Sequence, residues 1–182
     1  MVPIHRYLPM FLWLKNTEMW DKELGTGYVP KDAADMKRVL QALTKPPNVY
    51  GVGSSQGAAL QLATIAEVFG APNDWKMDAT GKLIKNWETE EYKAAAGWVR
   101  DLWASGVYHP NSTTFASNVV TRSNFAGGKM ATYFDPINGW QDSWRQSLQN
   151  FNPPHNVGHV GLFPATAGQK PQHFFQGGNL WA

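Results

Sequence analysis

The chain has 182 residues, of which 16 are lysine or arginine and 14 are aspartate or glutamate, giving a formal net charge of +2. Because the charges nearly balance and no basic block stands out, neither nucleic acid nor an anionic membrane surface is expected as a partner. The sequence has no cysteine, which excludes disulfides, thiol nucleophiles and thiolate metal sites. A chain of this length favours one domain.

The first part of the chain predicts an extended segment followed by two helices. Residues 4–14 are apolar and aromatic and read as a strand, and residues 16–25 read as a short helix that stops at Gly25. Asp32 is expected to cap the second helix, with Asp35 in the reciprocal position of a capping box. This helix carries apolar residues at helical spacing and is ended by two prolines: Met36, Val39, Leu40 and Leu43, then Pro46 and Pro47.

The next segment predicts a short strand over 49–53 and a helix over 56–70. Ser54 or Ser55 is the expected cap of that helix, because a serine side chain can accept a hydrogen bond from a free amide of the first turn. Its buried face is expected to be Leu62, Ile65, Ala66 and Phe69.

Residues 73–88 predict a β-hairpin with its turn at 78–81. The longest helix follows, with Thr89 as its cap and two glutamates near its positive end. The side chains of this helix that are expected to face inward are Tyr92, Ala95, Val99, Leu102 and Trp103.

The last part of the chain predicts short elements of both kinds. They are a helix over 121–129 stopped by glycine, a strand over 130–134, a helix over 138–149, and two late strands over 159–164 and 172–178. Helices that alternate with few and short strands are typical of an α/β layered domain. The sequence therefore predicts a helix-rich α/β fold with a short mixed sheet flanked by helices.

Three stretches, in this order, resemble the extracellular solute-binding proteins of ABC sugar importers, the group that includes maltose-binding protein. Residues 12–36 match a passage of strand, short helix, glycine, proline and capped helix. Residues 81–110 match a hairpin strand and a long helix, and residues 125–140 match a helix end, a strand and a Gly-x-Trp-like turn. The resemblance covers roughly residues 8–165, although Asp32 and Asp35 replace the threonine and the aromatic or acidic pair usual after the proline.

The resemblance implies one lobe of a periplasmic-binding-protein type II fold, with residues 1–182 as a single ligand-binding lobe. Family members have two lobes, whereas Met1 opens directly on mid-fold sequence and Ala182 follows a predicted strand. The N-terminal lobe and the C-terminal return segments are therefore expected to be absent. Such a lobe is expected to expose the surface that meets its partner lobe, and to self-associate.

The resemblance also implies a sugar site at the turn after strand 130–134, because ligands of α/β sheets bind at the carboxyl ends of strands. Gly139 lets the backbone approach a ligand, and Trp140 offers a flat face to a sugar ring. Asp135 and Asn138 can bond sugar hydroxyls, or can instead serve the turn itself. Packing of Trp140 in the core, on one helix stripe with Trp144 and Phe151, is the equally weighted alternative.

A second part of the site is implied after strand 49–53, where Ser54, Ser55 and Gln56 are carried over by position. Helix capping is the plainer role for the two serines, and Gln56 is the better candidate for sugar contact. No cofactor or metal is expected: His155 and His159 have helical spacing, but Pro-Pro and Val-Gly flank them and no third ligand is apparent.

The function that follows is carbohydrate binding, of an oligosaccharide, as the substrate-binding component of an ABC transporter. It implies capture by hinge closure, a membrane permease as partner, and an extracytoplasmic protein with a lipid anchor. Two alternatives remain open. A carbohydrate-active hydrolase fragment would need two carboxylates on facing elements, and no convincing pair is present. An interaction module would bind no small ligand at all.

Overall fold

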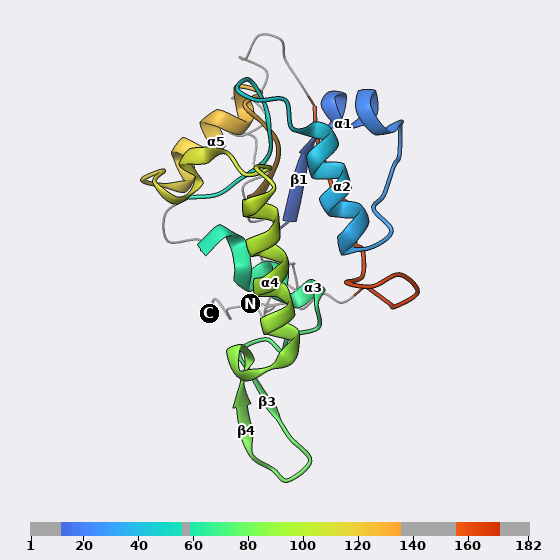
Figure 1. Cartoon of the computed structure of the whole chain (residues 1–182), viewed down its shortest axis with the longest axis vertical. Helices are drawn as coiled ribbons and strands as arrows, with labels where there is room; N and C mark the ends of the chain where they lie inside the picture. Colours follow the sequence, from blue (N-terminus) through green and yellow to red (C-terminus); the bar gives the residue numbers. More distant parts are fainter. Residues whose placement is uncertain (1–11, 56–58, 136–155, 172–182) are drawn as a thin grey trace, which may run out of the picture.

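A four-stranded mixed sheet lies at the centre of the protein, in a computed structural model that describes residues 12–55, 59–135 and 156–171 (Figure 1). The strand order is β2-β5-β1-β6. The strands are β1 (Leu12–Asn16), β2 (Tyr50–Gly53), β5 (Met130–Asp135) and β6 (Val157–His159). β2 runs parallel to β5, whereas β1 runs antiparallel to both β5 and β6.

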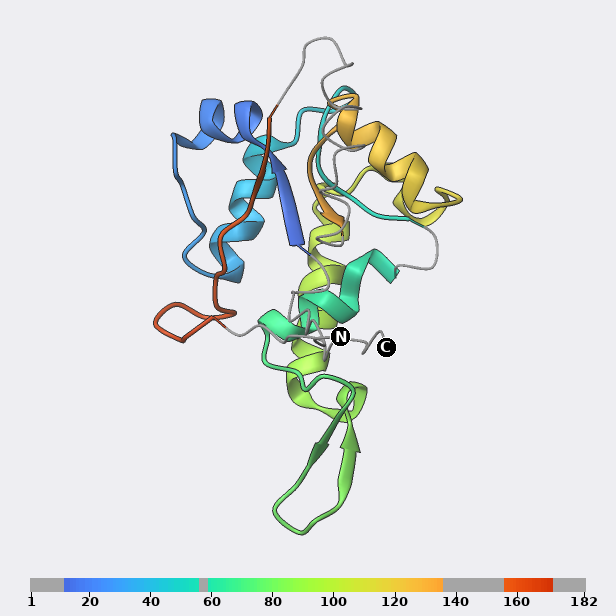
Figure 2. The same cartoon turned by 180° about the vertical axis from the view of Figure 1, so that it is seen from behind.

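Five α-helices within the described residues pack around this sheet (Figures 1 and 2). They are α1 (Thr17–Leu24), α2 (Ala33–Leu43), α3 (Leu62–Val68), α4 (Glu90–Ala104) and α5 (Asn118–Ala126). Short 3-10 turns lie at η1 (Ala59–Gln61), η2 (Asn86–Glu88) and η3 (Pro110–Thr113). The predicted helix-rich α/β class with a short mixed sheet is confirmed.

The two faces of the sheet bury different clusters, because successive strand residues point to opposite faces. Trp13 of β1 pairs with Phe134 of β5, and both pack with side chains of α2, α3 and α4. Leu14 pairs with Tyr133, and both pack in a second cluster that includes Phe125 and Ala126 of α5. The sheet is thus covered by helices on both sides.

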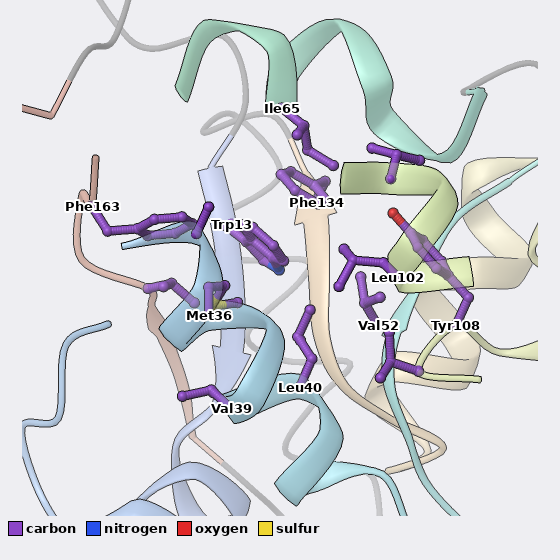
Figure 3. Close-up of a cluster of buried hydrophobic side chains, with 14 of the residues drawn as sticks. Trp13, Met36, Val39, Leu40, Val52, Ile65, Leu102, Tyr108, Phe134 and Phe163 are labelled. Atoms are coloured by element: carbon purple, nitrogen blue, oxygen red, sulfur yellow. The ribbon is translucent and has the colours of Figure 1, made fainter. Parts of the chain in front are cut away.

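The larger cluster is aromatic where it meets the sheet (Figure 3). The rings of Trp13 and Phe134 stack with centroids 4.4 Å apart, and Phe163 lies 5.9 Å from Trp13. The Trp13 indole Nε1–H donates to the Thr132 hydroxyl over 2.9 Å. Met36 and Leu40 of α2, both fully buried, close the cluster from above the sheet, as helical spacing predicts.

The ends of α1, α2 and α4 follow their sequence signals. Gly25 ends α1 with a φ of 91°, and Asp32 caps α2 by accepting a hydrogen bond from the Asp35 amide. Thr89 caps α4 through the Tyr92 amide. The hairpin of β3 (Trp75–Met77) and β4 (Leu83–Lys85) is also where the sequence predicts it, with the turn between them.

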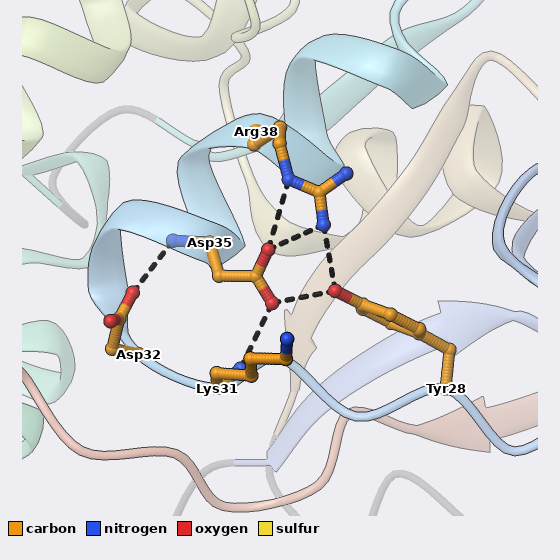
Figure 4. Close-up of polar contacts among 5 residues, drawn as sticks. All are labelled: Tyr28, Lys31, Asp32, Asp35 and Arg38. Atoms are coloured by element: carbon orange, nitrogen blue, oxygen red, sulfur yellow. Dashed lines mark hydrogen bonds and ion pairs between the residues drawn. The ribbon is translucent and has the colours of Figure 1, made fainter. Parts of the chain in front are cut away.

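Asp35 differs from the predicted reciprocal partner of a capping box (Figure 4). Its carboxylate accepts hydrogen bonds from the Tyr28 hydroxyl at 2.6 Å, from the Lys31 amide at 3.0 Å and from the Arg38 Nε at 3.0 Å. Partial burial raises the pKa of Asp35. The hydrogen bonds from Tyr28, Lys31 and Arg38 together outweigh this effect, and the pKa is lowered to about 2. The ionised Asp35 therefore fastens the loop before α2 to the first turns of the helix.

Three predictions of element position were wrong. Helix α3 begins at Leu62 rather than near residue 56, α5 covers Asn118–Ala126 rather than 121–129, and β6 covers Val157–His159 rather than 159–164. The predicted inward position of Trp103 was also wrong. Trp103 is 39% exposed, because its neighbour Leu102 takes the buried position and adjacent helix residues point about 100° apart. The predicted helix over 138–149 and strand over 172–178 lie outside the described residues.

Candidate functional site

The parallel pairing of β2 and β5 brings the carboxyl ends of two strands together at one edge of the sheet. Val52 pairs with Thr132 and Gly53 with Tyr133, so Ser54 and Ser55 leave β2 beside the point where β5 ends at Asp135. Ligands of open α/β sheets bind at this kind of edge. Three of the seven predicted site residues therefore share one edge, although they are separated by about 80 positions in the sequence.

The remaining predicted contacts lie outside the described residues. These are Gln56, Asn138, Gly139 and Trp140. They continue the chain directly from Ser55 and from Asp135, so their assignment to the site stays a prediction from sequence. His155 is likewise outside the described residues.

Ser54 and Ser55 do not cap a helix, contrary to the plainer of their two predicted roles. The N-cap of α3 is Gln61, six residues after Ser55. Both serines are buried, Ser54 completely and Ser55 to 5% exposure. Their roles are to join β2 to segments that are distant in sequence.

The partners of the two serines form a polar cluster, which consists of Ser54, Ser55, Ser112, Asn118 and Thr121. The Ser55 hydroxyl donates to the Asn118 side-chain oxygen over 2.6 Å, and the Ser54 amide donates to the Ser112 hydroxyl over 3.2 Å. The Thr121 hydroxyl donates to the Ser54 carbonyl over 3.1 Å. Among the described residues the Ser54 hydroxyl itself has no hydrogen-bond partner. The cluster fixes the start of α5 against the end of β2.

Sequence reasoning missed three members of this cluster, namely Ser112, Asn118 and Thr121. Their partners lie 58 to 67 positions away along the chain, so no local pattern pairs them. The available signal was weak: small polar residues recur on both sides of Phe115, just before a segment with helical composition.

The position of β2 is fixed by a close approach to α2. The Gly51 amide donates to the Thr44 hydroxyl over 3.0 Å, and that hydroxyl donates to the Leu40 carbonyl over 2.7 Å. On its other side the Gly51 carbonyl accepts from the Thr132 hydroxyl over 2.7 Å. A methyl group on Gly51 would lie 2.6 Å from the Leu40 carbonyl oxygen. Only glycine therefore allows this spacing of strand and helix.

Backbone strain lies next to the strand ends. Ala59, Leu60 and Gln61 have φ values of 42°, 55° and 64°, a left-handed conformation that costs a non-glycine residue about 1–2 kcal/mol. The Tyr108 hydroxyl donates to the Leu60 carbonyl over 2.9 Å. Burial raises the pKa of Tyr108, so this donor stays protonated. Strain that is held by surrounding structure is a recurring feature of binding sites.

The tryptophans divide between core and surface. Trp13 and Trp20 are buried, and half-buried Trp98 donates its Nε1–H to the Ala33 carbonyl over 3.0 Å. Trp75, Trp87 and Trp103 are exposed, whereas Trp140, Trp144 and Trp181 lie outside the described residues. Most of the described indoles near the sheet therefore pack the interior.

Two other kinds of feature are absent from the described residues, namely a metal site and a membrane span. Within 12–55, 59–135 and 156–171, no three acidic or histidine side chains are placed together so as to hold a metal ion. No helix in the same part of the chain is long and apolar enough to cross a membrane.

No family model matches the sequence, and no curated protein matches it. The structure does resemble solved proteins. The ABC transporter solute-binding protein from Thermotoga lettingae TMO, bound with α-D-tagatose, matches at TM-score 0.64 and 20% identity over 90% of this chain and 42% of its own. The sugar-binding protein MalE from Xanthomonas citri matches at TM-score 0.65 and 18% identity, over 95% and 41%. The maltotriose-binding protein of Thermus thermophilus, bound with maltotriose, matches at TM-score 0.59 and 16% identity, over 94% and 41%.

These likenesses define the class of fold. Over 90% or more of its length the chain has the fold of the sugar-binding proteins of ABC transporters, as the sequence resemblance predicts. The chain spans 41–42% of the length of these three structures. All three are named as solute-binding or sugar-binding proteins.

Proposed function

We propose that residues 1–182 form a single ligand-binding lobe of the two-lobe substrate-binding component of an ABC transporter, and that its ligand is an oligosaccharide. The shared fold supports the class of protein, and the covered share of each neighbour, 41–42%, is compatible with one of two lobes. The observation that carries the proposal is that the carboxyl ends of β2 and β5 meet at one sheet edge. In the sequence, all seven predicted site residues lie at or directly after these two strand ends.

The proposed contacts divide by chemistry. Trp140 stacks on the carbon–hydrogen face of a sugar ring, and Gly139 permits the close backbone approach that this stacking needs. Hydroxyl groups of the sugar are bonded by Gln56, Asp135 and Asn138, which follow or end the two strands. Ser54 and Ser55 were predicted to join them, but both are buried, so they hold the strand end in place through the polar cluster. No bond is made or broken in this scheme.

Transport would use the lobe as half of a clamshell. A sugar held at the sheet edge draws a second lobe against it by hinge closure, and the closed form is what a membrane permease recognises. The proposal places the parent protein outside the cytoplasm and attaches it to the membrane by a lipid anchor.

Calorimetry of the two-lobe parent protein against monosaccharides and oligosaccharides tests the proposal. We expect saturable binding of an oligosaccharide, and Trp140→Ala is expected to weaken it at least tenfold, which corresponds to about 1.4 kcal/mol. Trp75→Ala is the matched control, because Trp75 is an exposed indole on β3, in the hairpin that extends away from the four-stranded sheet (Figures 1 and 2). Silence across the sugar panel, or equal losses from both variants, would contradict the proposal.

A further inference from the structure

The hairpin of β3 and β4 carries an apolar face that nothing else in the described residues covers. The hairpin extends past the end of α4, away from the four-stranded sheet, in both views (Figures 1 and 2). Trp75 pairs with Lys85 and Met77 pairs with Leu83 across the two strands, so these four side chains share one face. The apolar residues here, with Trp87 of η2, are 55% to 69% exposed. We call Trp75, Met77, Leu83, Lys85 and Trp87 the hairpin face.

The hairpin face is electrically neutral. The Lys85 Nζ lies 4.7 Å from the Trp75 ring centroid and 4.9 Å from that of Trp87, so the ammonium sits between two indoles. The same Nζ is 2.7 Å from the Asp74 carboxylate, and the Lys85 side chain is only 13% exposed. The charge on this face is therefore already paired, and its burial against another protein leaves no unpaired ion.

The turn and the opposite face hold the hairpin in place. Asp78 accepts hydrogen bonds from the Thr80 amide at 2.8 Å and the Lys82 amide at 3.0 Å, which closes the turn. On the opposite face Ile84 is half-buried, and the Lys76 Nζ lies 3.9 Å from a Glu91 carboxylate oxygen of α4. An isolated two-stranded hairpin is only marginally stable. The contacts within the turn and with α4 therefore stabilise the position of the hairpin face.

Charge and shape decide between possible occupants of the hairpin face. Residues 73–88 hold three lysines and three acidic residues, a net charge of zero, which does not fit an anionic membrane. A sugar ring is disfavoured as well, because the Lys85 ammonium already occupies one face of each indole. A second copy of the chain presents the same neutral face, so a two-fold pairing of the two faces brings together no excess of like charge.

The exposed apolar area of the hairpin face is large enough for two copies of the chain to associate. The four apolar side chains expose on the order of 500 Å², given about 250 Å² for a fully exposed large aromatic. Two copies face to face would bury about 1,000 Å², the lower limit for a specific interface. We propose that the hairpin face is an interface at which two copies of this chain associate, an inference that does not rest on the sugar-binding proposal.

Sedimentation velocity of the 182-residue chain over a wide range of concentration tests this interface. We expect a monomer–dimer equilibrium that Leu83→Asp weakens at least tenfold, because the dimer would bury an unpaired carboxylate. Leu162→Asp is the matched control, since both leucines are 60% exposed, and it is expected to leave the dimerisation constant unchanged. A chain that is monomeric at every concentration, or equal effects of the two variants, would overturn the proposal.

The absence of cysteine allows a second and independent test. Met77→Cys is expected to give a covalent dimer with a short bismaleimide linker, whereas Leu162→Cys is expected to stay monomeric. Circular dichroism spectra that match the wild type would show that both variants are folded. Equal cross-linking at the two positions would contradict a specific hairpin interface.

Discussion

Replacement of Gly51 by alanine probes how the sheet edge is positioned. The new methyl carbon would lie 2.6 Å from the Leu40 carbonyl oxygen and 3.0 Å from the Thr44 hydroxyl oxygen. The carbonyl belongs to the backbone of α2 and cannot rotate away, so strand and helix must separate. Overpacking of this kind costs about 1–3 kcal/mol, and the separation also strains the hydrogen bond from the Gly51 amide to Thr44, worth about 1 kcal/mol.

The effect of the Gly51→Ala substitution on the unfolded chain opposes this loss of stability but is smaller. Alanine restricts the unfolded chain more than glycine does, which favours folding by about 0.4–1 kcal/mol. The net expectation for Gly51→Ala is a loss of about 1–3 kcal/mol in the free energy of unfolding. Gly97→Ala is the control: a methyl group at that position inside α4 meets nothing within 4 Å, so a gain of about 1 kcal/mol is expected.

Urea unfolding followed by circular dichroism measures both effects, with unchanged m-values as the check that the unfolded states are comparable. If Gly51→Ala were as stable as the wild type, or more stable like Gly97→Ala, the close approach of β2 to α2 would be refuted. The position of Ser54 and Ser55 would then need another explanation.

Three further changes test the strained turn and the two titrating groups. Ala59→Gly is expected to raise the free energy of unfolding by about 0.5–1 kcal/mol, because glycine adopts the left-handed conformation without strain. Ala94→Gly inside α4 is the control and is expected to lower it by about 1 kcal/mol. If both variants were less stable than the wild type, Ala59 would not be strained. Asp35→Asn is expected to lower stability by about 1 kcal/mol at neutral pH, a figure discounted because its partner Arg38 is largely exposed. Because the pKa of Asp35 is lowered to about 2, this loss is full above about pH 4 and disappears as the pH falls towards 2; a loss independent of pH would contradict the ion pair. Burial, and then the charge of Lys129, lower the pKa of His109, so the wild type is expected to lose stability as the pH falls below about 6.5. In the His109→Gln variant the urea midpoint of unfolding is expected to change less with pH below about 6.5. If the midpoint of this variant fell with pH as steeply as that of the wild type, His109 would be excluded as the source of the pH dependence.

Local elements could be predicted from sequence because their signals are local. The buried stripe of α2, the Thr89 cap and the hairpin turn at Asp78 each depend on residues within a few positions of one another. The start of α3 could not be predicted, because the backbone turns left-handed at Ala59–Gln61 and none of these residues favours that conformation. Composition gives no sign of such a turn.

The candidate site was predicted in outline but not in its internal contacts. The rule that ligands lie at strand ends places Ser54, Ser55 and Asp135 at one edge, and the parallel register of β2 and β5 brings them there. The roles of the serines could not be derived, because their partners Ser112 and Asn118 come from segments more than 55 residues away. Such pairs depend on tertiary packing, which no periodicity encodes.

Backbone NMR of the chain, titrated with an oligosaccharide at millimolar concentration, tests the central claim most directly. The account predicts that amide shifts concentrate at Ser54, Ser55, Asn118 and the end of β5, where the two strands finish. The exposed tryptophans of the hairpin face should stay unchanged. Shifts confined to that hairpin, or no shifts at any sugar concentration in the titration, would contradict a carbohydrate site at the sheet edge.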